Sequence, residues 1–555
     1  MRPEGKRDHM KIQYDTETYE GFQAMGAFAM ALMEAIGLRE YIDSMCSYDP
    51  ARRNLSPGMA VKAMLGPIFG FKHKSPLANI NLFYSSAPTD LLFGPKVEPG
   101  CLSDSTFGRA LDTLFEADRE EIIWKCAQMC ADKYGLSSDV FHMDATNFSL
   151  YAEPQEERDG VAVPAYSGHA KDGRNGLVQY SMVSVTDSNG LLRCQRPYGG
   201  NASDIVMDRD MIEFISKRLD CSASTIVADS KLANAGTVDM LFEKGLGFVT
   251  KCPSAFAGKI RDKVLKGSEG KMRACNVRDG AAIYDTFAEV GGRQLRFVVY
   301  SLGIDEEDSA RFYLEDGEKR IGAVFGKLMG MEFNCGPDAE QALDDAVDAC
   351  GLTAYEITAE VVPYEVQTKR PARGRPRKGA EAPAAVTKYR IEASWEFDEN
   401  VAKRMGEDRG TQVLITNIPR SDKVGKNLRE GADAETVMMA YLGEYRIEHT
   451  YRIMKSGLGV DSVYLHTPER ENAMMFVIGI ATIISNTVDA VLGRMPGKKV
   501  TMDRLCWKMI SVSVDYDRED DCVCIRGYKG ANKEFFGYLD ALNIFPGLLL
   551  GYSGK

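Results

Sequence analysis

The spacing of apolar and polar residues changes along the chain and predicts regions of different structure. In residues 1–135, two segments are apolar and rich in alanine and methionine, Gly21–Ile36 and Pro57–Phe71, and two are amphipathic at helical spacing, Ser105–Phe115 and Glu120–Tyr134. Apolar residues three and four positions apart line one face of a helix. We therefore expect a helical N-terminal region that ends near residue 135.

From residue 136 the pattern changes to short apolar or alternating segments, which are typical of strands. A turn signal at Asp187–Gly190 joins the second and third of these strands. Helical spacing separates the third strand from the fourth and the fourth from the fifth. The predicted strands are Val140–Asp144, Leu177–Thr186, Leu191–Arg196, Thr225–Asp229 and Gly247–Lys251, and the predicted helices are Met207–Leu219 and Ala233–Lys244. The order β-β-β-α-β-α-β predicts the first part of a ribonuclease-H-like α/β core over residues 136–254.

Residues 255–425 have a strand-like, irregular texture and predict a β-rich insertion. It contains a basic, proline-rich loop at 369–385. Helical spacing returns over 426–495, where we expect the final helices of the core. The tail, 496–555, mixes short strands and turns. The expected fold class is therefore α/β: a ribonuclease-H-like mixed sheet core interrupted by a β-rich insertion, with a helical N-terminal region.

Composition and charge narrow the class of protein. With 555 residues, 44% of them hydrophobic, the chain can bury more than one core. Its net charge of -12 argues against a broadly basic nucleic-acid binder, although phosphate contacts depend on local patches. Thirteen scattered cysteines lack zinc-site spacing and predict free thiols in a reducing cytoplasm.

Membrane and export signals are weak. The most apolar stretch, Met474–Ser485, is shorter than the ~20 residues that a spanning helix needs, so it predicts a buried helix. The first residues contain no apolar segment of the kind found in secretion signals. We expect a soluble, cytoplasmic protein that does not contact a membrane.

Three acidic residues lie at positions from which they could bind a catalytic metal ion. Asp144 and Asp229 end predicted strands, and Glu448 lies on a predicted helix near the end of the core. Carboxylates are the ligands that Mg²⁺ prefers, and two metal ions ~4 Å apart can activate and stabilise both oxygens of a phosphodiester displacement. A single aspartate at a strand end is more often a turn or cap residue. The combination is what favours a catalytic and metal-binding triad.

Six short segments together carry a resemblance to a known family. The chain resembles the DDE transposases of bacterial insertion sequences, in the branch with a tyrosine–arginine–glutamate–lysine signature. The likeness extends over roughly residues 105–490. The segments are Met143–Thr146, Gly168–Arg174, Gly200–Asp204, Val227–Ser230, Leu414–Asn417 and Ile447–Lys455.

Within the signature, Tyr441 and Lys455 fall at the tyrosine and lysine positions around Glu448. Glu444 occupies the arginine position, which is a departure that Arg446 or Arg452 would have to compensate. On a continuous helix, Glu448, Arg452 and Lys455 would share one face. That face would bind metal through the acid and DNA phosphate through the two cations. An exposed helix with ordinary ion pairs is the alternative.

Further DNA contacts are expected outside the signature. Lys171 and Arg174 precede the second strand, near the first acid in the expected fold. Arg373 and Arg375 belong to an RGRP sequence that resembles a minor-groove binding arm, or else a solvated loop. The helical region 1–135 is expected to bind the transposon end, and 496–555 to contribute to dimerisation or DNA contact.

The resemblance implies cut-and-paste transposition by a homodimer on double-stranded DNA. The expected substrates are the terminal inverted repeats and target DNA, and the expected cofactors are two Mg²⁺ or Mn²⁺ ions per site. A hairpin intermediate is typical of this branch. Three alternatives remain open: a ribonuclease-H-like nuclease without strand transfer, a DNA-binding remnant that cannot cut, and an unrelated acidic protein.

Overall fold

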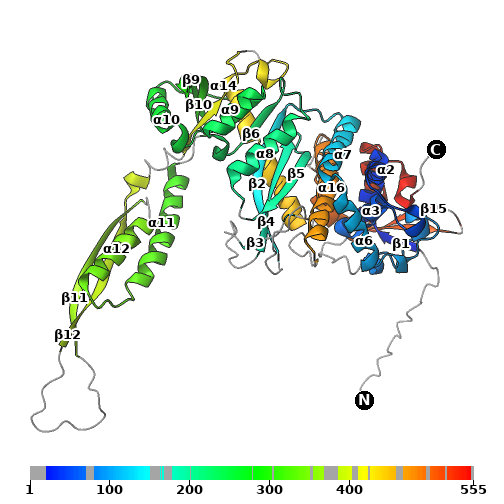
Figure 1. The fold of residues 1–555 in the computed structure, drawn as a ribbon, viewed down its shortest axis with the longest axis horizontal. Helices are drawn as coiled ribbons and strands as arrows, with labels where there is room; N and C mark the ends of the chain where they lie inside the picture. Colours follow the sequence, from blue (N-terminus) through cyan, green and yellow to red (C-terminus); the bar gives the residue numbers. More distant parts are fainter. Residues whose placement is uncertain are drawn as a thin grey trace, which may run out of the picture. The chain divides into compact units, whose positions relative to one another are not determined.

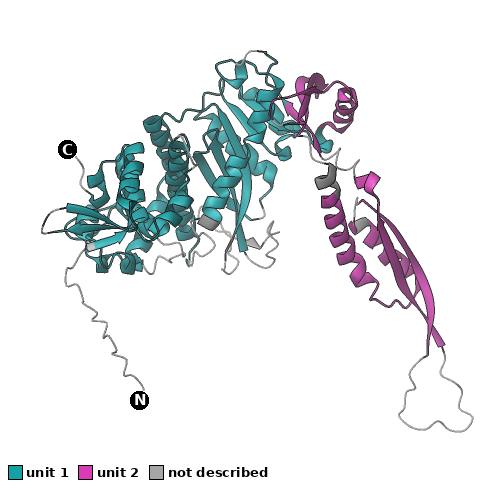
Figure 2. Ribbon diagram, turned by 180° about the vertical axis from the view of Figure 1, so that it is seen from behind, with its two compact units in different colours: residues 1–256, 416–555 teal, residues 257–415 magenta. Residues whose placement is uncertain are grey.

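The chain forms two compact units, residues 1–256 with 416–555 and residues 257–415 (Figure 2). The structure is a computed structural model. It describes the chain apart from residues 1–19, 71–79, 151–162, 164–165, 168–177, 201, 278, 303–305, 351–353, 368–384, 403–409, 423–424, 458–464, 466, 496–499, 519, 521 and 552–555.

A mixed sheet forms the centre of the first unit. Its strands are β2 (Val140–Leu150), β4 (Val178–Asp187), β5 (Leu192–Gly199), β6 (Thr225–Ala228) and β7 (Gly247–Lys251). They lie in the order β5-β4-β2-β6-β7, and the two-residue β3 (Tyr166–Ser167) also pairs with β4. The first three strands along the chain pair antiparallel, whereas β6 pairs parallel with both β2 and β7. This topology confirms the predicted ribonuclease-H-like arrangement.

Helices cover the sheet and complete the core. They are α8 (Asp204–Ser216), α9 (Ala235–Glu243), α14 (Ala434–Leu442), α15 (Tyr445–Arg452) and α16 (Pro468–Leu492). The apolar α16 packs against β5 and against two N-terminal helices, α6 (Asp104–Glu116) and α7 (Arg119–Tyr134) (Figure 1). Among the described residues, it is the one helix long and apolar enough to cross a membrane, and 83% of its apolar window is buried inside the protein. Such burial is typical of a core helix.

The N-terminal helices and the C-terminal segment share one hydrophobic core. The helices include α1 (Ala24–Ile36), α2 (Leu38–Met45), α3 (Pro57–Gly70), α4 (Ile80–Phe83) and α5 (Thr89–Phe93). The C-terminal elements are α17 (Met502–Lys508), β14 (Ser513–Asp517), β15 (Cys522–Arg526) and α18 (Ala531–Ala541). Strand β14 pairs with β15 and with β1 (Glu20–Gln23), so the two ends of the described chain meet in one small sheet (Figure 1). The sequence analysis did not predict this pairing.

The second unit has strands and two long helices. Strands β8 (Arg273–Ala274), β9 (Ala282–Val290), β10 (Arg293–Ser301) and β13 (Thr411–Thr416) are neighbours in one sheet, and β11 (Tyr355–Gln367) pairs with β12 (Ala385–Phe397). The helix α10 (Ser254–Ser268) begins at the boundary, and α11 (Glu306–Leu328) and α12 (Gly336–Cys350) follow. Phe325 and Ile391 are buried in a separate cluster of this unit. Strands were predicted in this region, whereas the helices α11 and α12 were not.

Candidate active site

The sheet places Asp144 and Asp229 side by side. Met143 on β2 is the register partner of Ala228 on β6, so the residues that follow them occupy neighbouring positions on two parallel strands. Both aspartates are partly exposed. The Tyr451 hydroxyl donates to the Asp144 carbonyl, and the Thr250 hydroxyl donates to the Asp229 carbonyl at 2.5 Å. These bonds fix the backbone beneath both carboxylates.

A third acid, Asp208 on α8, approaches the same place and was missed by the sequence analysis. Its side chain is 7% exposed. Burial raises its pKa to about 7, and the negative charges of Asp229, Asp204 and Asp144 act in the same direction, against Lys231. A signal was present in the sequence, because Asp208 falls in the apolar stripe of α8, four residues before Ile212 and seven before Ile215.

The helix α15 brings two glutamates to the site region in different environments. Ile447, Thr450 and Tyr451 form its buried side, and the helix packs on β2 and β4. Glu448 is exposed. Glu444, one turn earlier, is half-buried, which raises its pKa. The Tyr441 hydroxyl and Lys251 oppose this rise, whereas Asp229 and Glu448 add to it. The residue at the unexpected position of the signature therefore feels the charge of Asp229 directly.

Lys455 does not share a face with Glu448, in contrast to the expectation from a continuous helix, whereas Arg452, one turn after Glu448 on α15, does. After Arg452 the backbone forms a π-helical turn, Ile453–Gly457, which changes the direction of the next side chains. Lys455 Nζ donates to Thr146 Oγ1 on β2 at 2.6 Å. Arg452 Nη2 instead donates to His449 Nδ1 at 2.6 Å. Lys455 thus lies over the strand of Asp144, and Arg452 lies with Glu448 on the other side of α15, in the wall of a cavity.

The tyrosine of the signature is buried beside the acids. Tyr441 on α14 is 4% exposed, and its ring centroid lies 5.6 Å from Lys251 Nζ. Lys251 ends β7, the strand next to β6. The Tyr441 side chain therefore contacts Glu444 and Lys251. Because it is buried, it is not available for the DNA contact that was expected of it.

An open cavity of about 1050 Å³ lies between α15 and the helices α16 and α17, within the first unit. Glu448 lies in its wall, together with Arg446, Arg452, Arg504 and Trp507. The Trp507 side chain is 61% exposed. Arginines bind phosphate, and exposed aromatic rings stack on unpaired bases. The cavity thus has chemistry suited to a nucleic-acid strand beside Glu448.

Four of the expected DNA contacts lie outside the described residues. They are Lys171, Arg174, Arg373 and Arg375. Their roles remain predictions from the sequence.

The acids of the sheet fit a divalent metal by their chemistry. In the part of the chain that the structure describes, no three His, Cys, Asp or Glu side chains are grouped closely enough to hold an ion as they stand. Asp144, within β2, and Asp229, directly after β6, nevertheless offer hard oxygen ligands on adjacent parallel strands, as Mg²⁺ prefers. Asp208 adds a buried carboxylate that feels both charges. The residues present therefore fit a Mg²⁺ or Mn²⁺ ion.

Comparisons with known proteins identify the family. A model of the transposase DDE domain matches residues 136–484, more than half of the chain. The chain therefore belongs to the DDE transposase family. A domain of unknown function (DUF4277) matches residues 25–128, which include α1, α3 and α6.

Comparisons with curated proteins and with solved structures add no further family. No curated protein matches the chain. Among solved structures, the piggyBac transposase in a synaptic complex with hairpin DNA is similar at 11% identity and a TM-score of 0.36. That match covers 89% of this chain and 82% of the other.

Proposed function

We propose that the protein is a cut-and-paste transposase of an insertion sequence. It cleaves DNA at the transposon ends and joins the freed 3′-hydroxyl groups to target DNA. The observation that carries the proposal is the pairing of β2 with β6, which sets Asp144 beside Asp229 in a chain of the DDE transposase family. Carboxylates on neighbouring parallel strands can hold the metal ions that phosphodiester chemistry uses.

In this proposal, Asp144, Asp229 and Glu448 hold two Mg²⁺ or Mn²⁺ ions. Bound metal supplies an activated oxygen nucleophile and stabilises the leaving oxygen. The role of the protein is to hold the carboxylates in position. Tyr451 and Thr250 anchor the two strand residues, and α15 carries Glu448 alongside β2. Glu448 is included because it occupies the glutamate position of the signature.

DNA contacts in the proposal follow from the placement of the cations. Lys455 lies over β2 and is suited to a phosphate near Asp144. Arg452 lies in the wall of the cavity next to Glu448, where a DNA strand would be held. Tyr441, which is buried, would affect DNA binding indirectly, by holding Glu444 and Lys251 in place. Lys171, Arg174, Arg373 and Arg375 are proposed as further DNA contacts on the sequence alone.

The proposed partners are the terminal inverted repeats and the target DNA. A homodimer would bring two ends together in the synaptic complex, and the protein would act in the cytoplasm on chromosomal DNA. Region 1–135 is proposed to bind the end sequence, and 496–555 to contribute to dimerisation or DNA contact.

The site is tested by cleavage of a labelled duplex that carries the element's terminal repeat. We expect cleavage with Mg²⁺ or Mn²⁺, and none with EDTA. Asp144→Asn, Asp229→Asn and Glu448→Gln should each lower the rate at least ~100-fold while DNA binding is kept, because each removes a charged metal ligand. Glu243→Gln, an exposed acid at the end of α9, is the matched control.

Two results would contradict the assignment. Metal-dependent cleavage that survives Asp144→Asn would remove Asp144 from the site. Loss of cleavage in Glu444→Gln with full activity in Glu448→Gln would show that the half-buried glutamate is the third ligand.

A further inference from the structure

Asp208 lies where α8 meets the end of β6. The helix packs against η4 (Ser230–Leu232), the short 3₁₀-helix that begins directly after Asp229. Lys231 of η4 forms an ion pair with Asp204 in the first turn of α8. Asp208 is one turn further along the helix, on its buried side, and its carboxylate feels the charges of Asp229 and Asp144. The side chain therefore lies on the buried side of α8, the helix that packs against the segment directly after Asp229.

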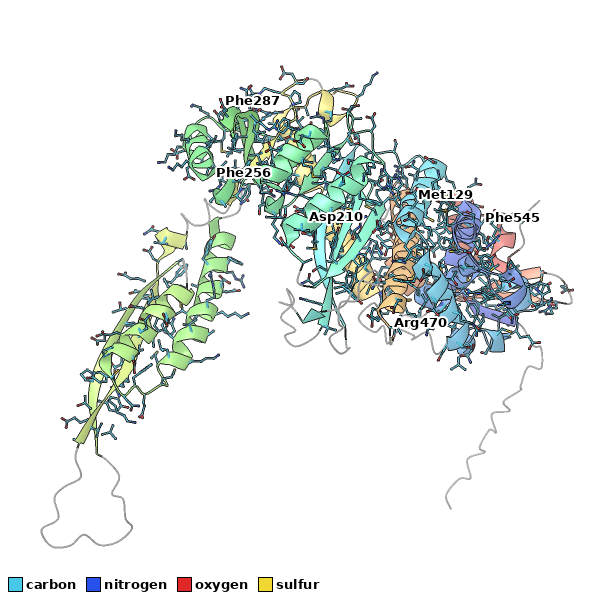
Figure 3. All side chains as sticks on the ribbon, viewed as in Figure 1. Met129, Asp210, Phe256, Phe287, Arg470 and Phe545 are labelled. Atoms are coloured by element: carbon cyan, nitrogen blue, oxygen red, sulfur yellow. The ribbon has the colours of Figure 1, made fainter. Side chains whose placement is uncertain are left out.

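The Asp208 side chain is largely buried, although its carboxylate oxygens are not fully enclosed. It is 7% exposed, and among the described residues no donor forms a hydrogen bond or ion pair with it. The neighbouring acids of α8 are satisfied. Asp204 pairs with Lys231, and Asp210 (labelled in Figure 3) accepts from Arg196 at 2.5 Å and from Tyr198 at 2.7 Å. Asp208 is the exception on this helix.

Such a placement is unfavourable for a purely structural acid. A buried ionised carboxylate without a partner costs several kcal/mol, and nearby negative charges add to the cost. The cation that acts on Asp208, Lys231, is already paired with Asp204. A divalent cation would offset the charge of all three acids, and buried carboxylates in proteins commonly coordinate metals.

We propose that Asp208 is a further carboxylate of the divalent-metal site, binding the ion held by Asp144 and Asp229 directly or through a metal-bound water. The ligand class is a hard divalent cation, Mg²⁺ or Mn²⁺. This inference rests on the proposed function, and it adds to the three-acid signature a ligand contributed by the helix that follows the third core strand.

The test measures Mn²⁺ binding to the full-length protein without DNA, by isothermal titration calorimetry and by the electron paramagnetic resonance signal of free Mn²⁺. Asp208→Asn should weaken Mn²⁺ binding at least ~10-fold, the usual effect of losing a ligand or its supporting contact. Asp144→Asn is the reference for loss of the site. Glu213→Gln, which removes a charge from the partly exposed side of the same helix, should leave the affinity unchanged.

A stability measurement separates this role from a structural one. Because Asp208→Asn removes an unpaired buried charge, we expect its free energy of unfolding in metal-free buffer to equal or exceed that of the wild type. A lower value would indicate a structural carboxylate. Should Asp208→Asn not fold, Asp208→Ser serves for the same titration.

The outcomes distinguish this inference from the proposed function. Wild-type Mn²⁺ affinity in Asp208→Asn, with loss of binding in Asp144→Asn, would overturn the role of Asp208 alone. Unchanged binding in both variants would overturn the metal site itself, and the proposed function with it.

Discussion

At the scale of single residues, the site acids differ in how visible they are in the sequence. Asp144 and Asp229 were predicted because an apolar segment ends on each of them; this is right for β6, but β2 continues past Asp144 to Leu150 because its later residues pair with β4. Glu448 was predicted from the spacing of Tyr441 and Lys455. Asp208 was missed because an acid on a helix is usually exposed, and its burial depends on packing against the segment after Asp229. The direction of Lys455 was also not predictable, since a π-helical turn leaves no clear mark in the sequence.

Asp187 provides a residue-scale test at the β4–β5 turn, whose tip lines the cavity. It is fully buried, and its Oδ1 accepts from the backbone N–H groups of Asn189 and Leu191. Burial raises its pKa from 3.8 to about 6, although Arg193, with Nη1 3.6 Å from Oδ2, and Arg446 oppose the shift. Between these two values the folded protein retains a proton that the unfolded chain releases.

Raising the pH from about 4 to about 7 should therefore lower the stability contributed by Asp187, by up to about 3 kcal/mol, with little further change above that pH. Asp187→Asn removes this titration. Urea unfolding of both proteins should show the variant gaining on the wild type from about pH 4 to about pH 7, and a nearly constant difference at higher pH. A difference that does not vary with pH would mean that Asp187 ionises normally.

At the scale of elements, the core strands and helices followed from periodicity, because alternating and three-to-four spacing are local properties. The contacts between elements did not. The helices α1 and α3 pack so closely that a Cβ on Gly26 would lie 2.6 Å from the Gly66 carbonyl oxygen. The sequence shows two glycines in apolar helices, and only the packing explains them.

Gly26→Ala should therefore destabilise the first unit by about 1–3 kcal/mol, because neither backbone can move without disturbing the core. The control is Gly537→Ala in α18, where an added Cβ meets nothing within 4 Å. This change should be neutral or stabilise by about 0.5–1 kcal/mol, as alanine favours helices over glycine. Thermal and urea unfolding measure both. Equal effects of the two substitutions would refute the close contact.

At the scale of the whole molecule, the sequence predicted an α/β core with a long insertion, and the structure separates residues 257–415 as a compact unit with a core of its own. The pairing of β1 with β14 joins residues almost 500 positions apart. Such contacts depend on the complete fold, and periodicity carries no information about them. The amphipathic helices α11 and α12 were missed because many charged residues separate their apolar positions.

The central claim is that the protein transfers DNA strands and does not merely cut them. The most direct test supplies a duplex whose terminal repeat ends in a free 3′-hydroxyl, together with supercoiled plasmid and Mg²⁺, and assays covalent joining. We expect joined products with the wild type and none with Asp144→Asn or Asp229→Asn. Efficient cleavage of the uncut repeat without any joined product would contradict the account and identify a ribonuclease-H-like nuclease.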